Sequence, residues 1–310
     1  MESLKPDSES TRSIDQLKVK EQWNSQIKIL GKLGITETFP DSKSYGIRGI
    51  DGQEYPVPTP DEIRNRLEAN KDIILEKMNQ GFTKLILVPF GYSFDNLSKK
   101  YSQTILKHYN EGKLLATKEK ATDPDEALEL DQDEPLWRWE DGYSKCDTED
   151  KIVYFPKEFS KQNHGGQTKK ELLKSDPANA WQILLIEDMP NIPRVGKGKV
   201  IGNRKQLETN KSSNEYLEMF QTEAEYKNES GLTPEADLMY SITHLEETNQ
   251  VINDYSGKGS ASRQTGAYFL SSADVPSSCW HRNCRQGGLY RNYPTNRSSN
   301  FGVRPGVRVK

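Results

Sequence analysis

The stretch SSCWHRNCRQGGLYRNYPTNRSSNFGVRP, residues 277–305, decides how the carboxyl-terminal part of this chain is interpreted. It is rich in Gly, Asn, Arg and Ser and shows no helical period. A short apolar run at 268–270 precedes it. In residues 301–309, apolar side chains alternate with Gly and Arg, which is typical of a strand with one buried face. We therefore expect residues 272–300 to form a long excursion between two paired strands.

Upstream of this stretch, helix and strand patterns alternate. Thr59-Pro60-Asp61-Glu62 is a capping box with proline at the first helical position, and it predicts a helix that ends before Gly81. Further elements are expected as helices at residues 97–109, 213–220 and 233–252 and as strands at residues 84–88, 152–155 and 181–186. The segments between them are polar and rich in Lys, Gly and Pro, which predicts long loops and an α+β fold.

The 310 residues, 33% of them hydrophobic and 29% charged, fit one large domain with long insertions. Residues 1–22 have the polar composition of a mobile tail, so we expect a single domain over residues 23–310. No apolar run resembles a signal peptide or approaches the length of a membrane span, which predicts no membrane insertion. The cysteines, Cys146, Cys279 and Cys284, cannot all pair within one chain, which favours a reducing compartment.

Charge is distributed unevenly, although the formal net charge is only −3. Residues 123–150 hold twelve acidic and two basic side chains, whereas residues 259–310 hold eight basic side chains and one acidic one. Six of these basic residues are the arginines from 282 to 308, interleaved with Gly, Asn and Ser, a mixture that suits hydrogen-bonded loops at least as well as phosphate binding. We therefore expect no nucleic-acid partner, and a solvated acidic loop rather than a calcium site at residues 123–150.

The end of the quoted stretch carries a family resemblance. Residues 291–304 read RNYPTNRSSNFGVR, which is similar to the Arg-, Asn-, Pro- and Gly-containing repeats that end the variable proteins of diversity-generating retroelements. The spacing of Arg285, Pro294 and Arg304 also resembles the carboxyl-terminal signature of the formylglycine-generating-enzyme subclass of the C-type lectin fold. GLTPEADLMYSI, from Gly231, is similar to a helix start in that superfamily. The resemblance covers residues 231–310.

This resemblance implies a C-type-lectin-like fold with long insertions and a diversified segment at about residues 277–304. The implied function is selective, non-covalent binding of a protein or host-surface macromolecule, without catalysis, cofactor or metal. Members of the family occur in phages, archaeal viruses and cellular genomes, so the resemblance allows a cytoplasmic or a virion-associated location.

The resemblance also restricts which residue types can occur at the variable positions. Variable codons in this family cannot encode Lys, Glu, Gln, Met or Trp. These five types make up 81 of the 310 residues, so about six are expected among the 24 positions 277–300. Only Trp280 and Gln286 occur there. The depletion agrees with diversification, although any Gly- and Asn-rich loop is also short of Lys and Glu.

Under this interpretation, residues 277–304 divide into two groups. The expected scaffold residues are Trp280, Arg285, Gly287, Pro294, Gly302 and Arg304. The expected exposed and exchangeable ligand contacts are His281, Leu289, Tyr290, Asn292, Tyr293, Asn296, Ser298, Ser299 and Asn300. Tyrosine side chains lose little entropy on binding, so Tyr290 and Tyr293 are expected to contribute most to affinity.

Two other interpretations stay open. Cys279 and Cys284 have the Cys-x4-Cys spacing that copper-dependent formylglycine-generating oxidases use, and two thiolates suit Cu(I). Counted back from Pro294, however, the second cysteine of those enzymes would lie several residues farther upstream than Cys284. Alternatively, the stretch is a structural loop without a ligand.

Overall fold

Helices and strands are interleaved along the chain in this computed structural model, which describes residues 13–310. The helices are α1 (Val19–Lys32), α2 (Pro60–Ala69), α3 (Lys71–Asn79), α4 (Phe94–Asn110), α5 (Glu140–Tyr143), α6 (Lys169–Ser175), α7 (Ser213–Thr222) and α8 (Pro234–Thr248), with the 3-10 turns η1 (Ile14–Leu17), η2 (Pro177–Ala180) and η3 (Ala224–Tyr226). The strands are β1 (Glu37–Thr38), β2 (Tyr45–Arg48), β3 (Glu54–Pro56), β4 (Phe82–Val88), β5 (Leu136–Arg138), β6 (Ile152–Tyr154), β7 (Gln167–Thr168), β8 (Gln182–Glu187), β9 (Val200–Ile201), β10 (Arg204–Lys205), β11 (Ser230–Gly231), β12 (Ala261–Arg263), β13 (Ala267–Phe269), β14 (Val275–His281), β15 (Gln286–Asn292), β16 (Phe301–Val303) and β17 (Pro305–Val309).

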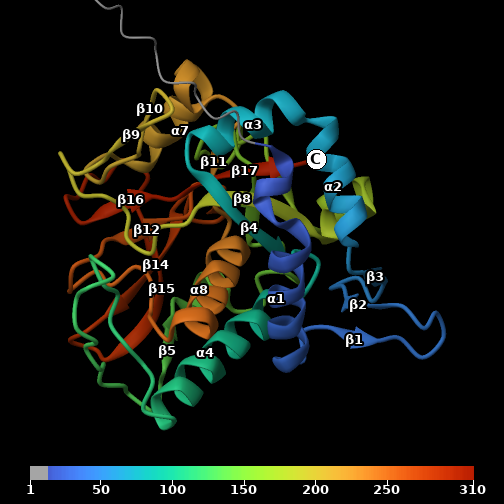
Figure 1. Cartoon of the computed structure of the whole chain (residues 1–310), viewed down its shortest axis with the longest axis horizontal. Helices are drawn as coiled ribbons and strands as arrows, with labels where there is room; N and C mark the ends of the chain where they lie inside the picture. The colour runs from blue at the N-terminus through green and yellow to red at the C-terminus, as the bar shows by residue number, and fades with distance from the viewer. Residues whose placement is uncertain (1–12) are drawn as a thin grey trace, which may run out of the picture.

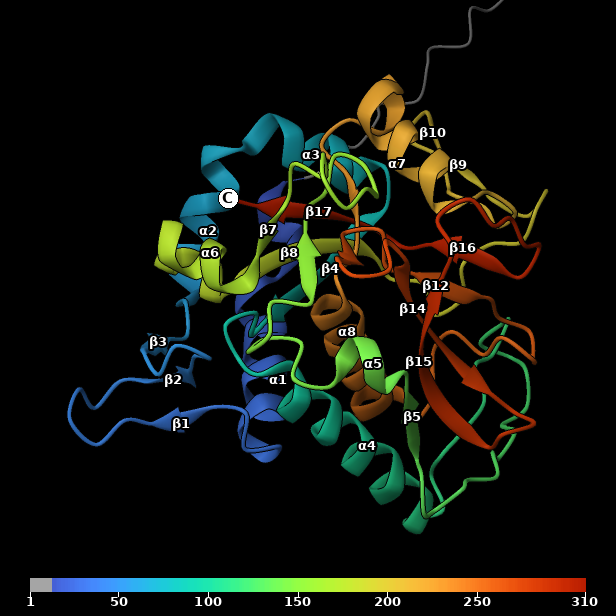
Figure 2. The same cartoon turned by 180° about the vertical axis from the view of Figure 1, so that it is seen from behind.

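Two of the sheets position the candidate site. One is antiparallel, with the order β11-β17-β8-β4, and the other is mixed, with the order β16-β12-β14-β15-β5. Helix α8 packs against both β4 and β14, and α4 packs against α8 (Figure 1). The helical layer therefore joins the two sheets into one core, which the view from behind also shows (Figure 2).

The first sheet ends at β4, whose free edge is covered by α1. Gln22 and Gln26 of α1 hydrogen-bond through their side-chain amides to the backbone of Thr83, Leu85 and Leu87. An unpaired strand edge is prone to aggregation, and these amides satisfy the groups that would otherwise be open. The apolar runs that predicted strands at 84–88 and 181–186 are thus confirmed as β4 and β8.

Other predicted elements are confirmed with changed boundaries. The capping box at Thr59 forms, with Glu62 donating its backbone N–H to the Thr59 hydroxyl and accepting from the Thr59 N–H. The helix that it opens is interrupted at Asn70 and continues as α3, which ends before Gly81. Helices α4, α7 and α8 lie where the apolar periodicity predicts them.

The fold begins earlier than the composition predicts. The side chains of Ile14, Leu17 and Val19 are buried, and α1 starts at Val19 rather than near Trp23. Three apolar residues at short spacing are enough to anchor a segment whose average composition is that of a tail. The mobile tail predicted for residues 1–22 is therefore wrong for residues 14–22, and residues 1–12 lie outside the described part of the chain.

The excursion predicted between residues 272 and 300 is also wrong. Residues 275–292 fold into the antiparallel hairpin β14–β15, which forms the centre of the second sheet. The strand predicted at 301–309 is divided at Arg304: β16 joins the second sheet, whereas β17 joins the first. Within one alternating pattern, the chain thus passes from one sheet to the other.

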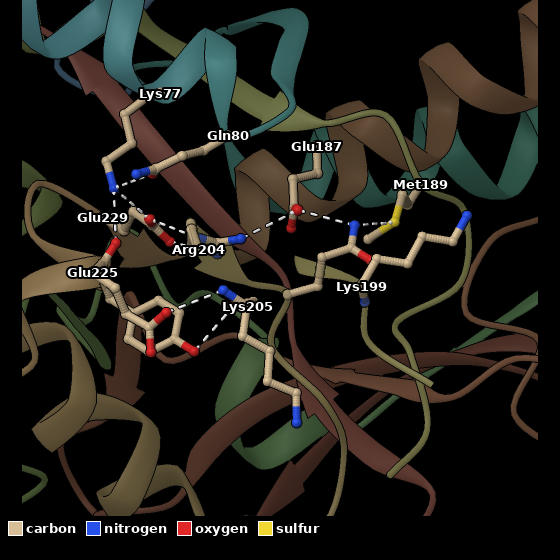
Figure 3. A network of polar contacts seen from close by, with 11 residues as sticks. Lys77, Gln80, Glu187, Met189, Lys199, Arg204, Lys205, Glu225 and Glu229 are labelled. Carbon is tan, nitrogen blue, oxygen red and sulfur yellow. Dashed lines mark hydrogen bonds and ion pairs between the residues drawn. The ribbon is translucent and has the colours of Figure 1, made fainter. Parts of the chain in front are cut away.

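A buried ion network holds the arm that carries β9 and β10 (Figure 3). Arg204 of β10 donates from Nε and Nη2 to the Glu229 carboxylate, both at 2.7 Å, and from Nη1 to Glu187 at 3.2 Å. Lys77 of α3 lies 2.6 Å from Glu229. The four side chains are almost completely buried and carry no net charge together, so each charge has a partner.

His244 of α8 adds a pH-dependent contribution to stability. Burial lowers the pKa of His244 from 6.5 to about 4, and the residue is 8% exposed. The unfolded chain protonates His244 at a higher pH than the folded protein does. The free energy of unfolding therefore keeps the full His244 contribution above about pH 6.5 and falls by up to about 3 kcal/mol as the pH approaches 4. We expect His244→Gln to lose less stability than the natural chain between about pH 7 and pH 4.5 in urea unfolding. Equal losses in the two proteins would contradict this assignment.

None of the helices within residues 13–310 combines the length and the apolar character that crossing a bilayer requires.

Candidate binding surface

One face of the second sheet packs against the helical layer, and on the other face Val275, Ser277 and Cys279 are buried as well, so that this outer face is open only near Tyr290 and His281. Residues paired directly across neighbouring strands point to the same side, and successive residues of a strand point to opposite sides. Trp280 and Leu289 are fully buried and mark the inner face, which α8 and α4 cover. Tyr290, which pairs with Ser277, therefore lies on the outer face.

Two aromatic side chains lie side by side on this outer face. The Tyr290 ring lies flat over Gly288, where an added Cβ would be 2.1 Å from the ring. It stacks on Trp137 of β5, with centroids 4.8 Å apart and planes inclined by 28°. Both rings are half-buried, so each keeps an open side. The face presents a rigid aromatic surface that loses little entropy on contact with a ligand.

A second aromatic group lies nearer to β16. Tyr255 packs on His281, with ring centroids 6.0 Å apart, and on Phe301, at 5.6 Å. All three residues are half-buried. Phe301 also covers the guanidinium of Arg263, which lies 5.0 Å from the ring centre. Sequence reasoning missed Tyr255, because it lies outside the stretch that carries the resemblance.

The loop 293–300 connects β15 to β16 and is held by its backbone. Hydrogen bonds from other segments reach the carbonyl oxygens of Pro294, Asn296, Ser298, Asn300 and Phe301. The donors are the backbone N–H groups of Asn214, Asn210 and Ala261 and the Arg263 guanidinium, at N···O distances between 2.8 and 3.1 Å. The path of the loop therefore does not depend on most of its side chains.

Arg263 is an unusual part of this frame. Its side chain is buried, forms no ion pair within residues 13–310, and donates one hydrogen bond, to the Asn296 carbonyl. Burial lowers the pKa of Arg263 to about 10. A buried cation is held here by a backbone dipole and by the ring of Phe301, which couples β12 to the loop.

The exposure of the predicted contact residues follows the strand register. Tyr293 is 60% exposed, and Asn296 and Ser299 are exposed as well. The half-buried members of the predicted set are His281, Tyr290, Asn292, Ser298 and Asn300. Leu289 was expected to be exposed, and this is wrong: it pairs with Ser278, points inward and is fully buried. Adjacent strand residues cannot both face solvent on a sheet with one covered face.

Four of the predicted scaffold residues are buried, namely Trp280, Gly287, Gly302 and Arg304. At Gly302, a Cβ would lie 2.5 Å from the Ile192 side chain, so only glycine fits without a shift. Pro294 is half-buried and contributes its carbonyl oxygen. Arg285 does not fit a side-chain role, because its side chain is exposed. Its backbone has a positive φ of 55° and accepts a hydrogen bond from the Asp131 N–H.

A buried polar chain fixes the hairpin onto α8. Arg304 donates to Asn253, Asn253 donates to Ser278, and Ser278 donates to Asp237 of α8. Gln264 donates to the same Asp237 oxygen at 3.1 Å. Except for Arg304, these residues were missed from the sequence, since polar residues scattered over 237–278 give no periodic signal. Removing one member of this network would leave its buried partners without their hydrogen bonds, which is costly, so the chain of contacts specifies the position of the sheet.

The acidic segment is more than a solvated loop. Arg282, in the tip of the hairpin, forms ion pairs with Glu126 of that segment and with the buried Asp254. Residues 136–138 were expected to be part of a loop, but they form β5 and pair with β15. The segment therefore covers one edge of the hairpin and holds its tip in place.

The two cysteines of the Cys-x4-Cys spacing lie in different surroundings. All three are free thiols, and Cys279 is buried whereas Cys284 is exposed. Burial raises the pKa of Cys279 to about 12, which disfavours the thiolate that binds Cu(I). Within residues 13–310, no group of three or more His, Cys, Asp or Glu side chains is arranged to hold a metal ion.

Comparison with known proteins adds no relative. No family model, curated protein or solved structure matches this chain. The mixed helices and sheets confirm the α+β class. The C-type-lectin-like fold and the retroelement family stay predictions.

Proposed function

We propose that this protein binds a macromolecular ligand selectively and without chemistry, through the outer face of the second sheet and the loop 293–300. The observation that carries the proposal is the backbone-held loop. Its carbonyl oxygens take the hydrogen bonds that fix its path, while Tyr293, Asn296 and Ser299 extend into solvent. A rigid frame with exposed, replaceable side chains is the arrangement that binding loops need.

The shape of this surface favours a large ligand. Its side chains lie along a sheet face and a neighbouring loop, and the aromatic residues Trp137, Tyr290 and Tyr293 are distributed over it. Tyr and Trp are the residue types that dominate protein–protein contacts. A protein or host-surface macromolecule is therefore the proposed partner.

We further propose that the surface is diversified, as in the variable proteins of retroelements on a C-type-lectin-like scaffold. The motif at residues 291–304 and the scarcity of Lys, Glu, Gln, Met and Trp over 277–300 support this. The DNA beside the gene tests it. We expect a reverse-transcriptase gene and a near-copy of the codons for 277–304 that differs only where the copy carries adenine. If no such copy exists, the locus is not diversified and the surface binds a single fixed ligand.

The binding capacity itself is testable by exchanging the loop side chains. We expect a display library randomised at the exposed residues Tyr293, Asn296 and Ser299 to yield clones that bind immobilised lysozyme but not streptavidin, and the reverse. Selected clones should keep the cooperative thermal transition of the parent, because exposed substitutions change stability by about 0.5 kcal/mol each.

The control library randomises inward-facing residues of the same sheet, Trp280, Leu289 and Gly302, and should give mostly unfolded clones. Two outcomes contradict the proposal: loop clones that fail to fold, or folded loop clones of which none distinguishes the two proteins. The first would show that the exposed side chains support the frame.

A further inference from the structure

We propose that a basic hollow beside the candidate surface binds acidic polypeptide segments that also carry aliphatic side chains. The hollow is formed by residues outside 277–304, so it would be the same in every diversified variant. The inference goes beyond the proposed function and does not require that residues 277–304 vary.

The hollow lies between four separate parts of the chain. It has a volume of about 720 Å³ and is lined by residues 189–195 with Lys197 and Lys199, by Gln206, by the turn at 257–258 and by residues 118–119. Protein sites for ligands typically have volumes of about 300–1,000 Å³. Its size is therefore sufficient for several side chains of a bound segment.

The charge of the lining is predominantly positive. The cationic side chains are Lys118, Arg194, Lys197, Lys199 and Lys258. Glu119 is the one acidic residue of the lining. Lys118 and Lys258 form ion pairs with aspartates of the acidic segment, but the other three cations form no ion pair within residues 13–310. In a chain with a net charge of −3, such a site attracts acidic groups.

An exposed aliphatic residue lies at the same place. Only three large hydrophobic residues within 13–310 are strongly exposed: Val195 (56%), Val200 (70%) and Tyr293 (60%). Val195 lines the hollow, whereas Val200, the first residue of β9, is not part of the lining. Met189 and Ile192 complete an apolar wall. Exposed apolar side chains next to unpaired cations indicate a surface that a partner covers.

The base of the hollow is fixed. Gln206 donates from Nε2 to the buried Glu187 carboxylate at 3.1 Å and accepts from the Lys199 N–H at 3.1 Å. Figure 3 shows the Lys199 side chain extending away from Glu187 and Arg204. The segment that carries Lys197 and Lys199 is thus anchored to the ion network just before β9 begins, which lowers the entropy cost of binding.

The hollow also adjoins the candidate surface. The turn at Gly257 and Lys258 follows Tyr255, which packs on His281 and Phe301. A segment seated in the hollow would continue onto the outer face of the second sheet. The hollow would supply a constant anchor, and the loop 293–300 the selectivity.

The lining chemistry favours a peptide over a nucleic acid. None of the lining residues is aromatic, so bases would have no surface for stacking. A nucleic-acid backbone also offers phosphates without aliphatic groups to cover Val195. Aspartate or glutamate interspersed with valine or leucine matches both parts of the lining.

The test uses the full chain and two displayed peptide libraries. One is composed of Asp, Glu, Leu, Val and Gly, and the other replaces the acids by Asn and Gln. Enriched peptides are synthesised with fluorescein, and Kd is measured by fluorescence anisotropy. We expect enrichment from the acidic library alone, with binding that weakens as salt is raised.

Charge-matched variants assign the site. Lys197→Glu with Lys199→Glu should weaken binding by about tenfold or more. Lys161→Glu with Lys174→Glu makes the same charge change at exposed positions elsewhere and should leave Kd unchanged. Val195→Ser should weaken binding without changing its salt dependence.

Three outcomes overturn the proposal. One is equal enrichment from the neutral library, and another is equal Kd values for the two charge-reversed pairs. The third is tighter binding of fluorescent oligothymidylate that the Lys197 and Lys199 substitutions abolish, which would assign the hollow to single-stranded nucleic acid. Thermal unfolding of each variant checks that it is folded.

Discussion

Replacing Arg204 with methionine is expected to lower the free energy of unfolding by about 3–5 kcal/mol. The guanidinium is fully buried between the rings of Phe82 and Tyr226, at 4.9 and 5.2 Å from their centres. Without it, Glu229 keeps Lys77 as its only cation, and Glu187 keeps only the neutral Gln206. Two buried carboxylates then share one positive charge, which a low-dielectric interior does not tolerate.

Urea unfolding followed by circular dichroism measures this loss. Lys205→Met is the matched control: Lys205 is the next residue of β10, and its side chain is half-exposed beside Glu208. Lys205→Met should change the free energy of unfolding by less than about 1 kcal/mol. Adding Glu229→Gln to Arg204→Met should cost less than the sum of the single changes, because the two residues act as one unit. A loss for Arg204→Met no larger than that for Lys205→Met would mean that the network contributes nothing.

Trp280→Ala is expected to cost about 3–5 kcal/mol through the cavity that it leaves. Trp280 is 1% exposed and lies on the inner face of the second sheet. Its backbone also bonds to Asn253 and Tyr255, so a shift of β14 would disturb the segment that supports the aromatic group. Loss of this one side chain should therefore loosen the whole candidate surface.

The adjacent residue provides the control. His281 is the next residue of β14, points to the outer face and is half-buried. We expect His281→Ala to change stability by less than about 1 kcal/mol in the same urea unfolding experiment. If His281→Ala destabilises as much as Trp280→Ala, then the inner and outer faces are not distinct and the surface is part of the core.

The sequence predicts the elements of this fold better than their connections. Capping residues and apolar periodicity are local, so they place α2, α4 and α8. The division of 301–309 between two sheets is not local. Apolar and small residues alternate through Arg304 without interruption, and only the partners, β12 for β16 and β8 for β17, distinguish the halves.

The candidate site shows the same limit. Composition and motif identify the segment 277–304, but they do not identify which residues face outward. Leu289 and Tyr290 are neighbours in a Gly-rich strand, and only the pairing with Ser278 and Ser277 assigns them to opposite faces. Trp137 stacks on Tyr290 from a segment about 150 residues away, and such a partner leaves no signal in a single sequence.

The loop 293–300 is held through its backbone carbonyl oxygens, and this determines which positions of the chain must keep their residue. Every amino acid, proline included, keeps its carbonyl oxygen, so a new residue at 296 or 298 keeps the backbone acceptor, and only the Ser298 hydroxyl that accepts from the Asn300 N–H would be lost. The residues that must stay constant are therefore those that donate hydrogen bonds to these carbonyl oxygens. Asn210 has a positive φ of 77°, which favours asparagine or glycine, and position 263 requires a guanidinium. If the loop is exchanged between variants as proposed, positions 210 and 263, which precede the segment 277–304, are expected to stay constant.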